Sequence, residues 1–260
     1  MSEPQQSPVD AMGVLVEKFF TTKRGPVTSR DLDLLGQGKA LNLSSGLAAT
    51  SWGQGPTVLL AHGWNSRRSH WGLFIPELIA QGFRVVAFDA PAHGDSAGTK
   101  VNVLKYGRAL MEVSREVGPV FGVIGHSFGA AAIVVAIKLG MVVDRAVLIS
   151  GPGSLLALIE RWARAHHVAE SEIPTFVELT AQEVGVPVTE FDLIAIAANH
   201  QTPALIIHDR SDDEIPVEEA VALAHAWPGA KLRLTERLGH RRILIAKTVV
   251  GEVMAFLVMS

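Results

Sequence analysis

A serine stands between two glycines at residues 125–129, which read Gly-His-Ser-Phe-Gly. β-Favouring residues precede this pentapeptide and an apolar helical run follows it, so the pattern predicts a strand, a tight turn and a helix. Such a turn lifts the Ser127 hydroxyl above the sheet, and the residues two before and two after it must be very small. The helix would also present its first N–H groups to developing negative charge. Ser127 is therefore a candidate nucleophile, and the plainer alternative is a capping serine at an ordinary turn.

A serine nucleophile needs a general base, and ten histidines compete for that role. His240 follows a Leu-Gly pair just after the last, weak apolar run of the chain, so it falls on a turn. A loop histidine beyond the last strand can reach over the edge where the serine is expected. His62, His126 and His208 also lie near strand ends or beside the serine, and a buried histidine bonded to backbone is the alternative for each. We expect His240 to be the base.

The base needs a carboxylate to orient it, and residues 208–216, His-Asp-Arg-Ser-Asp-Asp-Glu-Ile-Pro, contain three aspartates. They fall between a predicted strand and a helix that starts at proline. Asp209 could instead turn the chain, and Asp213 could be solvated or cap the helix. Asp212 is closest to the apex of the loop, so we expect it to be the acid. The chain order Ser, Asp, His is one that serine triads are known to adopt.

The elements that would position these residues follow from the apolar pattern. Six short runs without polar alternation indicate parallel strands covered on both faces: residues 57–61, 84–89, 121–124, 145–150, 204–208 and, more weakly, 231–234. Helices are predicted between and after them, several ending at a glycine: residues 69–80, 101–117, 130–139, a segment starting at Pro216, and 248–258. This alternation predicts an α/β fold with a mostly parallel central sheet flanked by helices and right-handed crossovers.

Two regions depart from this alternation. Residues 1–40 hold an amphipathic segment at 9–20 and are expected to form a helical extension that packs outside the sheet. Residues 151–203 separate two strands by far more than a usual connection, and helical stretches at 155–167 and 176–184 are interrupted at Pro174 and at residues 185–187. We expect this insertion to be a helical lid. The core would then comprise residues 41–150 and 204–260.

Composition limits the possible partners. The chain has 260 residues, 48% of them hydrophobic, with a net charge of −3 and no basic stripe, which argues against nucleic acid as a partner. It has no run long and apolar enough to predict a membrane span and no secretory signal pattern. The absence of cysteine excludes a cysteine nucleophile and thiolate-bound metals, and suits a reducing, cytoplasmic location. The expected partner is a small molecule, and the oligomeric state is left open.

Taken together, five motifs resemble those of the α/β-hydrolases. They are His62-Gly63-Trp64 after the first long strand, residues 89–96 (Asp-Ala-Pro-Ala-His-Gly-Asp-Ser), the pentapeptide at 125–129, residues 208–216, and Leu238-Gly239-His240. The resemblance implies an α/β-hydrolase fold with Ser127 as nucleophile, Asp212 as acid and His240 as base. It also implies an oxyanion hole made by the backbone N–H groups of Trp64 and Phe128. Ala92 departs from a glycine that is common in the family, and no cofactor or metal is implied.

The resemblance implies acyl transfer through an acyl-enzyme, and we expect a serine esterase acting on carboxylic esters of small or medium apolar substrates. Trp64, Phe128 and Trp162 are candidates for the substrate pocket, as is Trp71, although aromatic residues are more often core. Arg67 and Arg68 could meet an anionic substrate, but a solvated loop is the expectation. Two alternatives stay open. One is an acyltransferase or thioesterase with the same triad, and the other is a low-turnover small-ligand-binding protein on the hydrolase fold.

Overall fold

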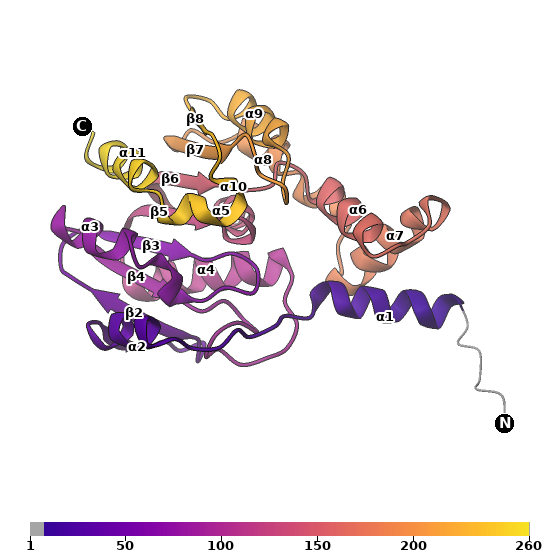
Figure 1. Cartoon of the computed structure of the whole chain (residues 1–260), viewed down its shortest axis with the longest axis horizontal. Coiled ribbons are helices and arrows are strands. Elements are labelled where there is room, and N and C mark those ends of the chain that lie inside the picture. Colours follow the sequence, from indigo (N-terminus) through magenta and orange to yellow (C-terminus); the bar gives the residue numbers. More distant parts are fainter. Residues whose placement is uncertain (1–7, 260) are drawn as a thin grey trace.

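The computed structural model describes residues 8–259, which form an eight-stranded sheet with helices on both faces (Figure 1). The strand order is β1-β2-β4-β3-β5-β6-β7-β8. Strands β3 to β8 are parallel, whereas β2 is antiparallel to both of its neighbours. The strands are β1 (Lys39–Asn42), β2 (Ala48–Trp52), β3 (Thr57–Ala61), β4 (Arg84–Phe88), β5 (Val120–His126), β6 (Val143–Ile149), β7 (Ala204–Asp209) and β8 (Lys231–Thr235). The structure therefore has the predicted α/β-hydrolase architecture with a mostly parallel sheet.

The inner parallel strands are buried on both faces, because successive side chains of a strand point to opposite sides. In β3, Leu59 and Ala61 join one apolar core, while Val58 and Leu60 join the other. The first core is covered by α4 (Val103–Val117), α5 (Phe128–Lys138), α8 (Leu193–Ala198) and α9 (Val217–Ala226). The second is covered by α2 (Ser29–Gly36), α3 (Phe74–Ala80) and α11 (Lys247–Val258). The sheet is thus the middle layer of three.

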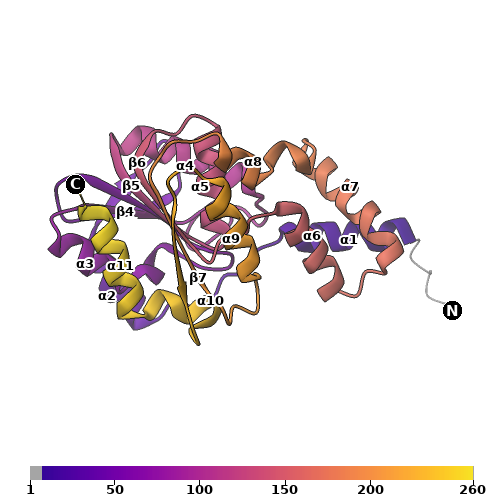
Figure 2. The same cartoon turned by 90° about the horizontal axis from the view of Figure 1, so that it is seen from above.

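A third apolar core lies outside these layers, and we call the three helices that form it the cap. They are α1 (Pro8–Phe20), α6 (Leu155–Ala165) and α7 (Ile173–Val184), and Figure 2 shows them grouped beyond one side of the sheet. Aromatic rings hold them together: the Phe19 ring lies 5.2 Å from that of Trp162, which stacks on Phe176 with centroids 5.4 Å apart. The two regions that departed from the strand–helix alternation therefore pack against each other.

The structure corrects several sequence expectations. Residues 39–42 form edge strand β1, so the first forty residues do not all lie outside the sheet. Strand β2 and helix α2 were not predicted. Pro174 does not interrupt a helix but lies in the first turn of α7, where its missing N–H costs nothing. Helix α8 lies within residues 151–203 but packs on the sheet core, so only part of that insertion belongs to the cap.

The chain between α1 and the core is fixed to the loop that follows β4. Thr22 N–H donates to the carbonyl of Thr99 at 3.0 Å, and the Arg24 guanidinium donates to the carbonyl of Ser96 at 2.6 Å. Lys23 N–H donates to the Asn65 side chain at 2.7 Å, beside Trp64. Helix α1 is therefore anchored from both sides, by the cap core and by this connector.

The remaining helices are short: η1 (Arg68–Trp71), η2 (Glu170–Glu172), η3 (Val188–Phe191), α10 (Gly239–Arg242) and η4 (Ile243–Ile245). Over the part of the chain that the structure describes, no helix combines the length and apolar character that crossing a bilayer requires.

Candidate active site

Ser127 occupies the corner between β5 and α5 with backbone angles φ 53° and ψ −117°, which a residue with a side chain rarely adopts. The glycines two residues away on each side make this corner possible. A Cβ atom on Gly125 would lie 2.7 Å from the amide nitrogen of Ala130, and one on Gly129 would lie 2.1 Å from the carbonyl oxygen of Ala61. Both positions therefore exclude any side chain, and the backbone strain at Ser127 is held by its surroundings.

Three predicted side chains meet in one hydrogen-bonded chain. The Ser127 Oγ lies 2.9 Å from His240 Nε2, and His240 Nδ1 lies 2.8 Å from Asp212 Oδ2. His240 is 5% exposed and the Asp212 side chain is fully buried, so water competes little for these bonds. Serine comes from the β5–α5 corner, aspartate from the loop after β7, and histidine from α10 after β8. All three stand at the carboxyl edge of the parallel sheet.

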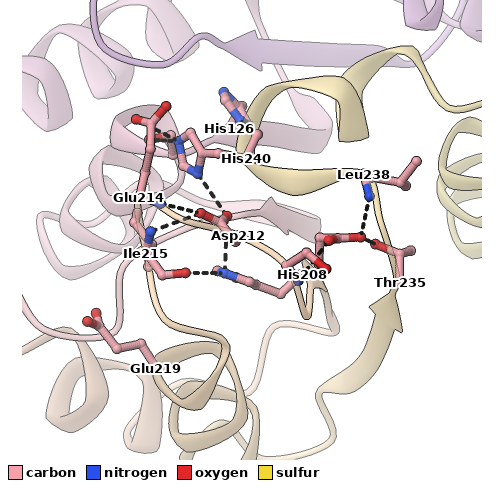
Figure 3. A network of polar contacts seen from close by, with 12 residues as sticks. His126, His208, Asp212, Glu214, Ile215, Glu219, Thr235, Leu238 and His240 are labelled. Carbon is pink, nitrogen blue, oxygen red and sulfur yellow. Dashed lines mark hydrogen bonds and ion pairs between the residues drawn. The ribbon is translucent and has the colours of Figure 1, made fainter.

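Hydrogen bonds surround the carboxylate of Asp212 (Figure 3). Its Oδ1 accepts the N–H groups of Glu214 and Ile215 at 3.0 and 2.9 Å, which makes the loop a tight turn. Its Oδ2 faces His240 and also lies 3.3 Å from His208 Nε2. Burial by itself would raise the pKa of the Asp212 carboxyl, but the hydrogen bonds from His208, His240 and the Ile215 amide together hold that pKa well below its ordinary value.

The histidine loop is fixed by two buried residues. Asp209 at the end of β7 accepts hydrogen bonds from the Thr235 hydroxyl at 2.7 Å and the Leu238 N–H at 3.1 Å (Figure 3). His126, next to the serine, places its Nε2 2.8 Å from the carbonyl oxygen of His240, so Nε2–H donates. Burial lowers the pKa of His126 to about 3, helped by the neighbouring His240. A neutral His126 therefore holds the His240 backbone in place.

Sequence reasoning treated His208, His126 and Asp209 as competitors for the base and the acid. The structure places all three around the chosen residues instead, as supports for Asp212 and His240. Asp213, the third aspartate of the loop, is exposed. The four-residue separation of His208 and Asp212 does not by itself predict that they touch, because this contact depends on how the loop folds back after β7.

Trp64, on the loop after β3, and Phe128, at the start of α5, both lie beside the serine. Their rings pack edge to face with centroids 5.0 Å apart. Phe128 is the first residue of α5, so its N–H has no acceptor inside the helix. Trp64 follows Gly63, where an added Cβ would lie only 3.3 Å from the Cβ of Ser127, so this loop runs directly beside the nucleophile. Both residues therefore lie close to the nucleophile, and the role of their amides belongs to the proposal below.

A cavity of about 260 Å³ opens over Ser127 and extends under the cap. Trp64, Phe128 and Trp162 line it, as the sequence suggested. The sequence did not suggest Phe19 and Phe20 of α1, because nothing in their local pattern shows which surface α1 packs against. Most of the other lining residues are apolar, namely aromatic Phe191 and aliphatic Val101, Val103, Pro152, Leu155, Leu158, Ile159, Ala181, Val184, Val186, Pro187, Val188 and Ile215.

Glu214 is the one charged residue that lines this cavity within the described chain. Its Oε2 lies 3.7 Å from His240 Nε2, and its Oε1 accepts from Arg241 Nε at 2.9 Å (Figure 3 shows the carboxylate beside the histidine). The Glu214 side chain is 44% exposed and so stands at the mouth. A negative charge at this position disfavours a second carboxylate close to the serine.

Trp71 is a core residue, which is the alternative that the sequence favours for aromatic residues, because it is 1% exposed and packs on Phe74 on the other side of the sheet. One sequence expectation about this region is wrong. Arg67 and Arg68 are not on a solvated loop. Arg68 is paired with buried Asp89 and, at 2.9 Å, with Asp95, while Arg67 is 7% exposed. Arg68 fastens the loop that carries Trp64 to β2, where it donates to the Thr50 hydroxyl at 3.2 Å, and Arg67 contacts Asp95 of the loop after β4 at 3.5 Å.

His166 and Glu170 are of residue types that can bind metals, but both have other partners in the structure. His166 stacks on the Trp162 ring at 3.7 Å, and Glu170 forms an ion pair with Arg164 at 2.8 Å. Among the described residues, no three histidine, aspartate or glutamate side chains converge as metal ligands.

The sequence and the fold are both similar to those of known proteins. The model of the "Alpha/beta hydrolase family" matches residues 58–250. The human "Serine hydrolase-like protein" is 39% identical over 90 residues, which are 32% of this chain and 44% of that protein, so the match spans less than half of the relative. A bromoperoxidase from Bacillus anthracis superimposes with a TM-score of 0.65 at 19% identity, over 84% of this chain and 99% of that one. An esterase from Exiguobacterium antarcticum gives 0.63 at 16%, over 85% and 99%.

Proposed function

We propose that this chain, which belongs to the alpha/beta hydrolase family, is a serine hydrolase that cleaves carboxylic esters with small or medium apolar acyl groups. The hydrogen-bonded chain Ser127–His240–Asp212, opening into an apolar cavity, carries the proposal. Two similar proteins, a human serine hydrolase-like protein and an esterase, are in keeping with it.

In the first half of the reaction the Ser127 Oγ attacks the ester carbonyl carbon while His240 Nε2 takes its proton. Asp212, held ionised by its hydrogen bonds, keeps the Nδ1–H tautomer in place and stabilises the imidazolium that forms. The tetrahedral intermediate then breaks its bond to the alcohol oxygen, and His240 returns the proton to that oxygen. An acyl group remains on Ser127.

In the second half a water molecule gives its proton to His240 Nε2 and attacks the acyl carbon. The bond to Ser127 Oγ breaks, the proton returns to the serine, and a carboxylic acid leaves. The backbone N–H groups of Trp64 and Phe128 would stabilise the oxyanion in both halves. One such donor contributes on the order of 3 kcal/mol to transition-state stabilisation.

The substrate class follows from the cavity lining. Its aliphatic and aromatic walls favour an apolar acyl group, because each buried methylene contributes about 0.8 kcal/mol. Glu214 at the mouth disfavours acyl groups that carry a carboxylate near the ester. The cap helices would act as a lid over the acyl group.

Labelling with a fluorophosphonate probe tests the proposal directly, with native protein, Ser127→Ala and His240→Ala compared side by side. Hydrolysis of p-nitrophenyl esters of increasing acyl length is followed in parallel. We expect labelling and ester turnover in the native protein, and neither in the two variants.

A native protein that neither reacts with the probe nor cleaves any ester would reject the proposal. In that case the binding-protein alternative would be favoured. Labelling that persists in Ser127→Ala would place the nucleophile elsewhere in the chain.

A further inference from the structure

A single carboxylate stands at the mouth of a cavity whose walls are otherwise uncharged. Glu214 follows the triad residue Asp212 by two positions, and Figure 3 shows its carboxylate beside the imidazole of His240. Its side chain is 44% exposed, so a ligand can reach it from the mouth. Over the described part of the chain, no lysine, arginine or histidine lines the cavity. The charge that a bound molecule meets at this mouth is therefore negative.

The two oxygens of Glu214 have different surroundings. Its Oε1 accepts a hydrogen bond from Arg241 Nε at 2.9 Å, on the side away from the cavity lining. Its Oε2 lies 3.7 Å from His240 Nε2, which is too long for a hydrogen bond, and no other described residue donates to it. The Arg241 side chain is 76% exposed, so water screens its charge. One carboxylate oxygen is thus left available to a ligand.

This ion pair contributes little to the fold. Both side chains are substantially exposed, and ion pairs of that kind commonly stabilise a protein very little. The position of Glu214 in the cavity lining is therefore better explained by what enters the cavity than by the stability of the folded chain.

The proposed reaction brings the alcohol part of an ester to this oxygen. His240 Nε2 returns a proton to the alcohol oxygen, so the two atoms must approach to about 3 Å. Because Glu214 Oε2 lies 3.7 Å from the same nitrogen, the alcohol oxygen and Oε2 can be no more than about 7 Å apart. A charged group two carbons beyond the alcohol oxygen can therefore approach the Glu214 carboxylate directly.

We infer that Glu214 forms a subsite for a cationic group on the alcohol part of the ester, such as an ammonium group two carbons from the ester oxygen. The inference rests on the proposed esterase function and names the leaving group, which the apolar acyl cavity does not specify. A carboxylate at an opening with low-dielectric walls attracts a cation and repels an anion.

Two esters of butyric acid test the subsite, because they have the same shape and differ in charge. One is the trimethylammonioethyl ester, and the other is the dimethylbutyl ester in which carbon replaces the ammonium nitrogen. The native protein is compared with Glu214→Gln. Asp213→Asn is the control, because Asp213 carries the same charge next to Glu214, is exposed and does not line the cavity. The readout is the ratio of kcat/KM for the ammonium ester to that for the uncharged ester.

We expect this ratio to fall roughly fivefold in Glu214→Gln, as for the loss of one partly exposed ion pair. Asp213→Asn should leave the ratio unchanged. An unchanged ratio in Glu214→Gln overturns the inference. An equal loss on both esters also overturns it, since Glu214 would then act on His240 and not on the alcohol. A fall of the same size in Asp213→Asn overturns it as well, because that result indicates overall surface charge.

Binding measured without turnover separates this inference from the proposed function. Calorimetry compares the affinities of the two esters for Ser127→Ala and for the same variant with Glu214→Gln added. A selective loss of affinity for the ammonium ester in the double variant supports the subsite even when the native protein cleaves no ester. An equal ratio of affinities in the two variants overturns it, whatever the turnover of the native protein.

Discussion

Two regions enclose the same cavity, and a different kind of interaction stabilises each of them. The first, which we call the serine edge, consists of the turns that carry Ser127, Asp212 and His240, and directional hydrogen bonds to backbone and buried side chains fix it. The second is the cap, where the aromatic and aliphatic side chains of α1, α6 and α7 pack against one another. Hydrogen bonds fix atoms to fractions of an ångström, while apolar packing tolerates substitution of similar volume. The serine edge is therefore suited to chemistry and the cap to substrate choice.

The largest expected effect lies in the serine edge. Asp212→Asn should lower kcat for ester hydrolysis by about 10⁴-fold, because the amide no longer holds His240 in the required tautomer. Asp213→Asn, the exposed neighbour, should leave kcat near the native value. Steady-state kinetics on one good ester measures both. A loss of less than about tenfold in Asp212→Asn would mean that this contact does not orient the base.

Gly129→Ala should lower the free energy of unfolding by about 3 kcal/mol or more, because the new Cβ meets the Ala61 carbonyl at 2.1 Å and the backbone must shift. The matched control is Gly251→Ala in α11, where an added Cβ meets nothing within 4 Å. That change should raise stability by roughly 0.5–1 kcal/mol through helix propensity. Urea denaturation compares the two variants, and a tolerated Gly129→Ala would show that the corner is less tightly packed than its geometry indicates.

The serine edge should also respond to acid through buried His126. Its pKa is about 3 in the folded protein and near 6.5 when unfolded, so the unfolded chain binds the extra proton. The stabilisation from neutral His126 is complete above about pH 6.5 and is lost as the pH falls toward 3, by about 1.4 kcal/mol per pH unit. Between roughly pH 7 and pH 5, the free energy of unfolding of His126→Gln should therefore fall by about 2 kcal/mol less than that of the native protein. Denaturation at the two pH values measures this difference, and equal losses would contradict it.

The smallest expected effect belongs to the cap. Trp162→Ala should lower kcat/KM for long-chain esters by roughly tenfold and for short-chain esters by much less, because it removes part of the apolar cavity wall that the cap contributes. Leu156→Ala, exposed on the same helix, should change neither value. The acyl-length profile of each variant is the measurement. A uniform fall at all chain lengths would mean that the cap also positions the serine edge.

The same division explains what the sequence could and could not predict. Strands β3 to β8 and the Ser127 corner are encoded locally, by apolar runs and by two glycines that leave room for the turn. Strands β1 and β2 lack a continuous apolar run. The first is an exposed edge strand, and the second is only partly buried. Sequence analysis also left α1 without a partner, because its contacts with α7 join residues more than 150 positions apart. Local pattern specifies the sheet, and long-range packing specifies the cap.

The residues that support His240 could not be predicted from the sequence either. His208, His126 and Asp209 were recognisable as titratable residues near strand ends, but not as partners of Asp212 and His240. Their bonds depend on the exact path of two loops, one after β7 and one after β8. Arg68 was assigned to solvent for a similar reason, because its partner Asp89 lies on a different loop.

The location of α1 has a consequence for biosynthesis. The helix is made early, but its packing partners α6 and α7 follow only at residues 155–184. At roughly 5–20 residues per second, on the order of ten seconds or more pass before those partners exist. Throughout that interval Met12, Val16 and Phe20, which are buried in the finished cap, have no native surface to cover them. The nascent chain therefore offers chaperones an apolar helix that the mature protein conceals.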